Sequence, residues 1–468
     1  MNIPVRSYRG VKAVKGPLLF LEKTVRVSLG EFVRVTDPDG RVVRGQVVDA
    51  GRSVTVVQML DETFAIAPNR SDVTLTGEIP SIQVGKEMLG RVFTGGGAPL
   101  DDLPPPVGEA TRLLWAPPLN PVQRVPPHDF IETGISSIDG LNTLVRGQKL
   151  PVFSGAGLPG LEIASTVVEN ARVGEEEEFA VIFAGIGITS FEADDFLQRF
   201  ATGVAGERSV FFLNRAADPT IERILAPRIA LTVAEYLAFD CGMHVLVVMH
   251  DMSHYCEALR EIASAREEAP GRRGYPGYMY TDLASLFERA GVVRGCSGSI
   301  TQMPILTMPD DDMTHPIPDL TGYITEGQIV LSRNLHRQGV FPPVDILASL
   351  SRLMNNGIGA DKTVDDHRAW ADQLYASYAQ GREASLMAAV VGESGLSDAD
   401  RRALEFSGEL DKLFLNQGSK RRSITETVAL GWRLLSALPN EDLRRIDRHR
   451  WEVWSKKNPI QPSTDEVA

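Results

Sequence analysis

The chain has few cysteines, no long hydrophobic run and no surplus of basic residues. Its three cysteines, Cys241, Cys256 and Cys296, are far apart and match neither a disulfide framework nor a zinc-ligand spacing. So few cysteines are typical of a protein from a reducing compartment. The longest apolar runs, such as Val245–Met249, are much shorter than the roughly 20 residues of a membrane-spanning helix. The amino terminus has no apolar segment of the kind found in signal peptides, so we expect none.

The charge balance is acidic. The 468 residues include 61 acidic and 48 basic side chains, which gives a formal net charge of −13. Nucleic-acid binding depends on a surplus of Lys and Arg for phosphate contacts, so we expect no nucleic-acid partner. The hydrophobic fraction of 43% is ordinary for a globular protein, and we expect any membrane association to be peripheral, through partners.

Secondary-structure patterns change along the chain and predict a multidomain protein with four segments. Residues 1–75 read as short, valine-rich strands separated by turn residues, a spacing that predicts a small closed β-barrel. Residues 76–350 begin with loops and continue as an α/β domain, and residues 351–455 follow a helical period. The polar tail, 456–468, is expected to be disordered. The predicted strands are Leu18–Leu21, Thr24–Leu29, Glu31–Val35, Arg41–Val48, Ser53–Leu60, Phe179–Phe183, Ser209–Asn214, His244–His250 and Ile300–Met308, and the predicted helices are Pro219–Phe239, Asp365–Glu383, Ser397–Phe414 and Ser423–Leu438.

One glycine-rich stretch, Pro151-Val-Phe-Ser-Gly-Ala-Gly-Leu-Pro-Gly-Leu-Glu-Ile163, has the outline of a phosphate-binding loop. An apolar strand runs into a glycine-rich turn, and a helical pattern follows. In the working pattern, G-x-x-x-x-G-K-[ST], backbone N–H groups cradle phosphates, the Lys reaches the β- and γ-phosphates, and the hydroxyl binds Mg²⁺. The other interpretation is an ordinary strand-to-helix turn rich in Gly and Pro.

This loop departs from the working pattern at the positions that carry chemistry. Ser154 and Pro159 replace the two glycines, Gly160 stands at the position of the Lys, and Leu161 stands at that of the Ser or Thr. Proline also removes one backbone donor. We therefore expect nucleotide binding by the loop to be weak or vestigial, through Ser154, Gly155, Gly157 and Gly160, and we assign the chain no cofactor of its own.

Four further residues could belong to a metal or phosphate site. Asp251 follows the predicted strand His244–His250, where an α/β ATPase holds Mg²⁺, but it could equally cap the next helix. His250 and His254 do not share one helix face, so we predict no zinc site. Arg352 follows the stretch Pro342–Ser351, and its planar guanidinium suits phosphate oxygens, although a local salt bridge is the alternative.

Taken together, these stretches resemble the non-catalytic B subunits, or beta chains, of V-type and archaeal-type rotary ATPases. The resemblance covers about Tyr8–Leu438, and Pro342–Ser351 fits the rotary-ATPase signature P-[SAP]-[LIV]-[DNH]-x-x-x-S-x-S. The other stretches that carry it are Gly147-Gln-Lys-Leu-Pro-Val-Phe-Ser-Gly155, Asp218-Pro-Thr-Ile-Glu-Arg223, Glu257-Ala-Leu-Arg-Glu261, Gly271-Arg-Arg-Gly-Tyr-Pro-Gly-Tyr-Met-Tyr-Thr-Asp282 and Ile317-Pro-Asp-Leu-Thr-Gly-Tyr-Ile-Thr-Glu-Gly327.

The resemblance implies an architecture and a set of partners. It implies an N-terminal β-barrel, a central RecA-like domain with a degenerate P-loop and a C-terminal helical bundle. Three copies would alternate with three catalytic A subunits around a central shaft formed by the D subunit, next to peripheral stalk subunits, at the cytoplasmic face of the cell membrane. ATP or ADP with Mg²⁺ would bind at the adjoining A-subunit site. Whether the transported ion is H⁺ or Na⁺, and whether ATP is mainly made or consumed, stays open.

The resemblance also implies roles for single residues. Arg352 would be an arginine finger that reaches into the neighbour's ATP site. In Gly185-Ile-Gly-Ile-Thr-Ser-Phe-Glu192, Ile188 takes the place of the Glu that polarises the attacking water in catalytic relatives. The residues expected at subunit interfaces are Tyr275, Tyr278, Ser349 and Ser351, and those expected to contact the shaft are Ser397, Asp398 and Asp400.

Two other hypotheses belong to different classes. A stand-alone hexameric ATPase, such as an export ATPase or an RNA translocase, would need a Lys in the loop, a carboxylate at position 188 and, for RNA, a basic lumen. None of these is visible in the sequence. A purely structural scaffold, in which Arg352 is incidental, is the other alternative.

Overall fold

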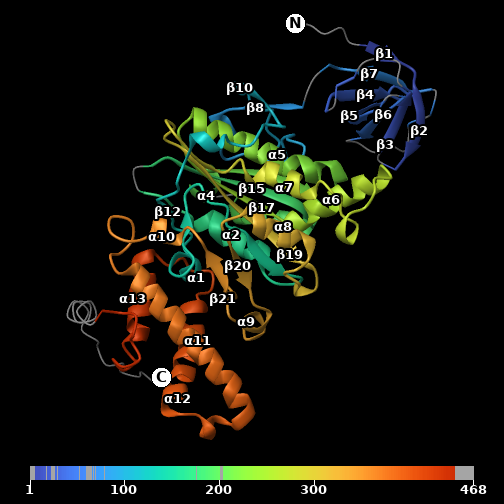
Figure 1. Ribbon diagram of the computed structural model, residues 1–468. Coiled ribbons are helices and arrows are strands. Elements are labelled where there is room, and N and C mark those ends of the chain that lie inside the picture. The colour runs from blue at the N-terminus through green and yellow to red at the C-terminus, as the bar shows by residue number, and fades with distance from the viewer. Residues whose placement is uncertain are drawn as a thin grey trace. The chain divides into compact units, whose positions relative to one another are not determined.

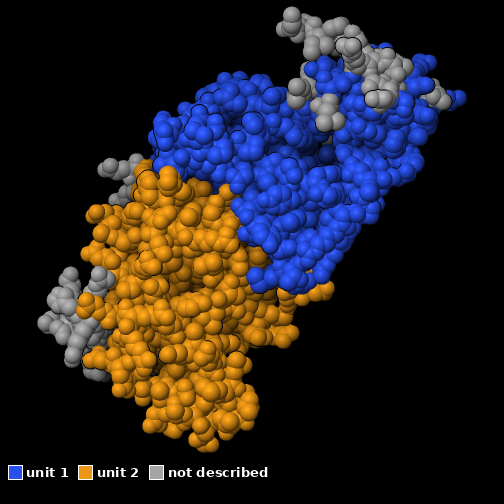
Figure 2. Space-filling model, in the orientation of Figure 1, with its two compact units in different colours: residues 1–125, 178–308, 312–324 blue, residues 126–177, 309–311, 325–468 orange. Residues whose placement is uncertain are grey.

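The computed structural model describes residues 6–16, 18–22, 27–28, 30–51, 53–59, 66, 68, 70–77, 80–174, 177–200 and 204–447. The chain divides into two compact units, and each is described by itself. Unit 1 consists of residues 1–125, 178–308 and 312–324, and unit 2 of residues 126–177, 309–311 and 325–468 (Figure 2). The border runs through the predicted α/β domain, so the predicted domain limits stay predictions.

The N-terminal part of unit 1 is an antiparallel sheet of seven strands in the order β1-β7-β4-β5-β6-β3-β2 (Figure 1). Alternation places Val33 and Val35 in the core while Arg34, between them, is exposed. Four of the five predicted strands are confirmed, and the fifth, Thr24–Leu29, lies mostly outside the described residues. Among the described residues the pairings run from β1 to β2 without closing the ring that we predicted. The strands are β1 (Arg6–Tyr8), β2 (Val11–Lys15), β3 (Leu18–Glu22), β4 (Phe32–Thr36), β5 (Val42–Ala50), β6 (Val54–Met59) and β7 (Asp72–Leu75).

The rest of unit 1 is built on parallel strands in the order β19-β17-β15-β16-β9. β15, β17 and β19 are buried almost throughout, as expected for parallel strands covered on both faces. The four strands predicted for this region are therefore confirmed. The remaining elements are β8 (Ser81–Val84), β9 (Val92–Thr94), β10 (Ala110–Leu113), β11 (Arg124–Val125), β15 (Phe179–Ile188), α3 (Ser190–Phe200), α4 (Val204–Glu207), β16 (Ser209–Arg215), α5 (Thr220–Glu235), β17 (His244–His250), α6 (Met252–Ala265), α7 (Met279–Phe287), β18 (Gly291–Val293), β19 (Ser299–Met308) and α8 (Pro316–Ile324).

Unit 2 combines a small sheet with helices. Its β14 pairs in parallel with β20, which pairs antiparallel with β21, and β12 pairs with β13. The three predicted C-terminal helices are confirmed as α11, α12 and α13. Helix α11 extends beyond the predicted end at Glu383 because good helix formers continue to Gly392, whose φ of +80° ends it. The elements are β12 (Phe130–Ile131), α1 (Ser136–Asp139), β13 (Leu144–Val145), β14 (Val152–Gly155), α2 (Gly160–Asn170), β20 (Gly327–Leu331), α9 (Arg333–Arg337), β21 (Val344–Ser351), α10 (Met354–Gly357), α11 (His367–Val391), α12 (Asp398–Glu409) and α13 (Ile424–Leu435).

A buried carboxyl group organises the start of unit 2. Asp139 is fully buried and accepts hydrogen bonds from the backbone N–H groups of Thr133 and Gly134, both at 2.8 Å, and from the Thr133 hydroxyl at 2.7 Å. Burial raises the pKa of the Asp139 carboxyl to about 7, against the effect of these hydrogen bonds.

The longest helix is α11, with 25 residues. Across the part of the chain that the structure describes, no helix combines the length and the apolar composition needed to cross a membrane.

Candidate functional site

The glycine-rich loop between β14 and α2 uses its own backbone donors internally. The Leu158 N–H donates to the Gly155 carbonyl at 3.0 Å, in a turn that requires the positive φ of +75° at Gly157. The Gly160 N–H donates to the Leu158 carbonyl at 2.8 Å, around Pro159 at φ −78° and ψ 57°, which is an inverse γ-turn. At positions 158 to 160, two N–H groups thus donate within the loop and the proline has no N–H. Few backbone donors therefore remain to bind phosphate as they do in working loops.

An ion pair lies against the same loop. Arg333 donates from Nη2 to the Ala156 carbonyl at 2.9 Å and holds the Asp311 carboxylate with bonds of 2.7 and 2.8 Å. A Cβ added to Gly155 would lie 2.0 Å from an Asp311 oxygen, so the carboxylate contacts the loop backbone. The hydrogen bond from Arg333 lowers the pKa of the Asp311 carboxyl below its ordinary value. A nucleotide phosphate would meet both charges of this ion pair, so the loop does not offer the unopposed positive charge that the Lys supplies in a working phosphate loop.

In unit 1, Asp251 is fully engaged in hydrogen bonds. One carboxylate oxygen accepts from the backbone N–H of Ser253 at 2.7 Å and of Thr307 at 3.2 Å, and the other accepts from the Thr307 hydroxyl. Asp251 is only 3% exposed and caps helix α6. Of the two interpretations of this residue, the geometry fits the helix cap rather than a Mg²⁺ ligand, which needs open carboxylate oxygens.

Strand β15 ends at position 188 without an acidic side chain. Ile188 is the last residue of β15 and is 2% exposed. The nearest carboxylate in sequence, Glu192, accepts from the Thr189 N–H at 2.7 Å, and the Thr189 hydroxyl accepts from the Glu192 N–H. This reciprocal pair caps α3, so it has a local structural role.

Among the described residues there is no group of three or more His, Cys, Asp or Glu side chains that could hold a metal ion. The Nδ1 of His254 lies 2.9 Å from the Ile186 carbonyl, so this ring nitrogen bonds to backbone.

The backbone of Arg352 is fixed by a buried polar network at the end of β21. The Ser351 hydroxyl donates to the Thr143 carbonyl and accepts from the Gln148 amide, both at 3.0 Å. Gln148 also donates to the Glu326 carbonyl, which accepts from the Arg352 N–H at 3.0 Å. These bonds tie Arg352 to two other segments of unit 2, so the start of its side chain has a defined position.

The guanidinium of Arg352 is exposed, in contrast to its anchored backbone. Its hydrogen bond, from Nη1 to the Thr325 carbonyl, is long at 3.4 Å. Within the described part of the chain, no carboxylate lies within 4.0 Å of this guanidinium. The alternative of a local salt bridge is therefore not realised among these residues.

Other predicted site residues have structural contacts within their own unit. Ser349 donates to the Asp345 carbonyl at 2.6 Å and accepts from the Val330 N–H at 2.9 Å, and like Ser351 it is buried. Tyr275 is buried with its hydroxyl on Glu257, and burial raises the pKa of its phenol, whereas Tyr278 is 38% exposed. The interface role of these four residues stays a prediction.

The three residues predicted to meet a shaft begin helix α12. The Ser397 hydroxyl accepts from the Asp400 N–H at 3.2 Å and donates to the Asp400 carboxylate at 2.6 Å, so Ser397 caps the helix. The Asp398 side chain is 84% exposed and has a 3.3 Å ion pair with Arg401. Nothing within this chain tests the shaft contact.

Sequence reasoning missed Asp311 and Arg333. The acidic run Asp310–Asp312 is visible in the sequence, but no motif or spacing links it to Arg333 or to the loop. Only the fold brings these segments together.

The chain matches sequence profiles of one family along most of its length. Residues 134–351 match the nucleotide-binding domain of the ATP synthase alpha/beta family, and residues 11–77 match the β-barrel domain of the same family. Residues 356–455 match the C-terminal domain of V and A type ATP synthase. These profiles confirm the predicted fold class, with a β-barrel domain, a nucleotide-binding domain and a C-terminal domain that is helical in the structure, although the described strands alone do not close the barrel.

Named relatives agree with these profiles. The chain is 54% identical to the V-type ATP synthase beta chain of Thermus thermophilus over 456 residues, 96% of this chain and 95% of the relative. It is 53% identical to the B subunit of the A-type ATP synthase of Methanothrix thermoacetophila, over 94% of this chain and 96% of the relative. A solved structure of the ATP synthase subunit NeqB from Nanoarcheaum equitans matches with a TM-score of 0.73 and 39% identity, over 91% of this chain and 100% of the other. The chain therefore belongs to the ATP synthase alpha/beta family, among the beta chains (B subunits) of V-type and A-type ATP synthases.

Proposed function

We propose that this B subunit is non-catalytic and completes the ATP site of a neighbouring catalytic A subunit with Arg352. The observation that carries the proposal is the exposed guanidinium of Arg352, which has an anchored backbone and no carboxylate within reach in the described residues. Such an arginine has a permanent charge and a planar fork to offer to phosphate oxygens of another chain.

Three features support a non-catalytic role. In the loop between β14 and α2, backbone N–H groups donate to carbonyls of the loop itself, and the Asp311 carboxylate contacts the loop. Ile188 has no acid–base chemistry, and the oxygens of Asp251 are occupied by hydrogen bonds. A stand-alone hexameric ATPase would need these groups, so the export-ATPase and RNA-translocase hypotheses have no support in the site.

The proposed setting is a ring in which three B subunits alternate with three A subunits. ATP or ADP with Mg²⁺ binds at the A-subunit site, the D subunit forms the shaft in the centre, and peripheral stalk subunits hold the ring. The ring lies at the cytoplasmic face of the cell membrane, and this chain reaches the membrane only through the complex. The complex couples ATP synthesis or hydrolysis to the transport of H⁺ or Na⁺.

The test is Arg352→Ala in a reconstituted ring of A and B subunits. An arginine finger supplied in trans contributes about 10³- to 10⁵-fold to turnover, so we expect a loss in that range while the ring still assembles. Arg352→Lys keeps the charge but loses the fork, and we expect it to restore only a small part of the rate.

The matched control is Arg368→Ala, which removes an exposed arginine of α11 with only a 3.9 Å pair to Asp372. It should leave turnover unchanged. Undiminished turnover in an assembled Arg352→Ala ring would instead favour the structural-scaffold hypothesis.

A further inference from the structure

Arg352 lies directly opposite a carboxylate that it does not bind. Strands β20 and β21 pair antiparallel, with Gly327 opposite Ser351. One step along this register places Glu326 opposite Arg352, and the Arg352 N–H donates to the Glu326 carbonyl at 3.0 Å. Residues directly opposite in an antiparallel pair have Cβ atoms about 4.5 to 5.5 Å apart, and opposite charges at such positions attract. The backbone alone therefore predicts an ion pair between these two side chains.

The Glu326 carboxylate is held by Lys149 instead. The Lys149 ammonium lies 2.8 Å from one carboxylate oxygen, and the Lys149 backbone N–H donates to the other oxygen at 2.8 Å. The Lys149 side chain is only 4% exposed, whereas that of Glu326 is 29% exposed. In the described part of the chain no carboxylate lies within 4.0 Å of the Arg352 guanidinium, which donates to the Thr325 carbonyl. Both oxygens of the carboxylate opposite Arg352 thus bond to Lys149.

The burial of Lys149 decides between the two cations. Solvent and salt screen a buried pair little, and loss of one partner would leave the other charge uncompensated. An exposed arginine gains little from a carboxylate, because water already solvates its guanidinium and pairing restricts its side chain. The carboxylate therefore stays on Lys149, and the Arg352 guanidinium stays exposed.

We propose that Lys149 is a positioning residue, which holds the Glu326 carboxylate away from Arg352 and so keeps the guanidinium open to the neighbouring subunit. Without the Lys149 ammonium, the Glu326 carboxylate turns toward Arg352 and pairs with it. The effect on turnover rests on the proposed function of Arg352. The choice of partner by Glu326 does not, because all three residues belong to unit 2 of this chain and can be tested in the chain alone.

Two variants separate the ammonium from the carboxylate. Lys149→Met removes the charge and keeps an unbranched side chain, and the addition of Glu326→Gln removes the carboxylate that is then able to pair. If Lys149 acts through Glu326, the double variant restores what the single variant loses. A purely structural role of Lys149 would give a loss that Glu326→Gln does not repair. Lys412→Met, at an exposed position after α12, is the matched control.

The first readout is labelling of the isolated full-length chain with phenylglyoxal, which modifies accessible guanidinium groups, followed by mass spectrometry of the peptides. A partly exposed ion pair shifts an equilibrium by up to about fivefold, so we expect Arg352 to react about fivefold more slowly in Lys149→Met. In the double variant and in Lys412→Met, it should react at the native rate.

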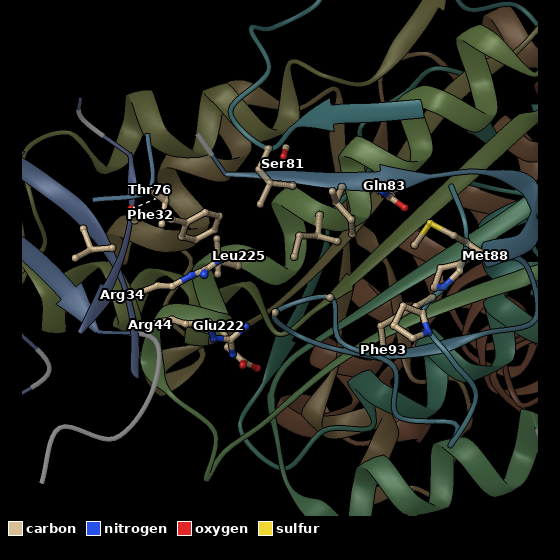
Figure 3. A pocket seen from close by; sticks show the side chains of 18 residues that line it. Phe32, Arg34, Arg44, Thr76, Ser81, Gln83, Met88, Phe93, Glu222 and Leu225 are labelled. Atoms are coloured by element: carbon tan, nitrogen blue, oxygen red, sulfur yellow. Dashed lines mark hydrogen bonds between the residues drawn. The ribbon is translucent and has the colours of Figure 1, made fainter. Parts of the chain in front are cut away.

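Arg34 is an internal reference in the same labelling reaction. It lies directly opposite Arg44 on β4 and β5, so its cross-strand neighbour is a cation and not a carboxylate. Figure 3 shows both side chains toward one end of a cavity of about 420 Å³ in unit 1, and Arg34 is exposed. Neither Lys149 nor Glu326 lines this cavity, so the labelling rate of Arg34 should be equal in all variants.

The second readout is ATP turnover by the ring assembled with A subunits. Because pairing withdraws Arg352 from the neighbour's site to the same extent, we expect about a fivefold loss for Lys149→Met and recovery to within about twofold in the double variant.

Two results would overturn the proposal. One is native labelling of Arg352 in a Lys149→Met chain that unfolds cooperatively, and the other is slow labelling that Glu326→Gln does not relieve. The expected labelling pattern without any change of turnover would support the role of Lys149 and contradict the finger role of Arg352, so failures of the two proposals are distinguishable.

Discussion

Two arginines of unit 2 have opposite surroundings. Arg333 is bound to the Asp311 carboxylate and to a carbonyl of the glycine-rich loop, whereas Arg352 has an anchored backbone and an exposed guanidinium. The first arginine is committed to its own chain and keeps a carboxylate against the loop. The second remains available to another molecule. The comparison teaches that a carboxylate within reach decides whether an arginine is held by its own chain or left with an exposed guanidinium.

After the loss expected for Arg352→Ala, the next largest effect should come from restoring the phosphate-loop pattern and removing the ion pair beside it. Ser154→Gly, Pro159→Gly, Gly160→Lys and Leu161→Thr together restore the phosphate-loop pattern. We expect this variant to bind Mg²⁺-ATP about a hundredfold more tightly when Asp311→Ala and Arg333→Ala are added, because the carboxylate no longer faces the phosphates. Calorimetry on both variants measures the ratio. Equal affinities would mean that the ion pair contributes nothing to the block.

A smaller effect should follow from weakening the hydrogen-bond network that positions the backbone of Arg352. Gln148→Ala removes the bonds to Ser351 and to the Glu326 carbonyl, so the start of the Arg352 side chain is less well positioned. We expect about a tenfold loss of turnover in the assembled ring, since small misplacements of a catalytic group reduce rate strongly. Gln338→Ala, at an exposed position after α9, is the matched control and should have no effect. A Gln148→Ala ring with full turnover would show that this anchor is dispensable.

A still smaller effect on turnover is expected when Arg333 is replaced. Arg333→Ala in the otherwise native ring should change turnover by about threefold or less, because the pair is partly exposed and, in this account, lies outside the catalytic site. Steady-state ATPase rates decide this. A loss as large as that of Arg352→Ala would remove the distinction between the two arginines.

The last prediction concerns stability rather than turnover, and it involves the buried carboxyl that precedes the loop. The folded pKa of Asp139, about 7, is higher than its value of 3.8 in an unfolded chain. Its contribution to stability is therefore fully present below about pH 4 and is lost as the pH rises through about 7. Carboxyl NMR shifts should give a midpoint near 7. A midpoint near 4 would show that the hydrogen bonds from Thr133 and Gly134 outweigh burial.

Sequence patterns predicted much of this structure because they report local physics. The alternation around Val33 and Val35 and the long apolar strands such as His244–His250 predicted the sheets, and the substitutions at Pro159 and Gly160 predicted a degenerate loop. What the sequence could not reveal depends on contacts between distant segments. Thr307, which occupies the Asp251 carboxylate with hydrogen bonds, lies 56 residues away in the sequence. Arg333 is likewise distant in sequence from the loop that it contacts.

The central claim is that this chain does not use its own degenerate loop for ATP and instead completes the site of a neighbouring subunit. Its most direct test is Mg²⁺-ATP binding to the isolated, native chain. The account predicts no saturable heat of binding up to about 1 mM nucleotide, with or without Mg²⁺, because the loop lacks both its donors and its cation. Micromolar binding that depends on Mg²⁺, or brisk ATP hydrolysis by the purified chain alone, would contradict it.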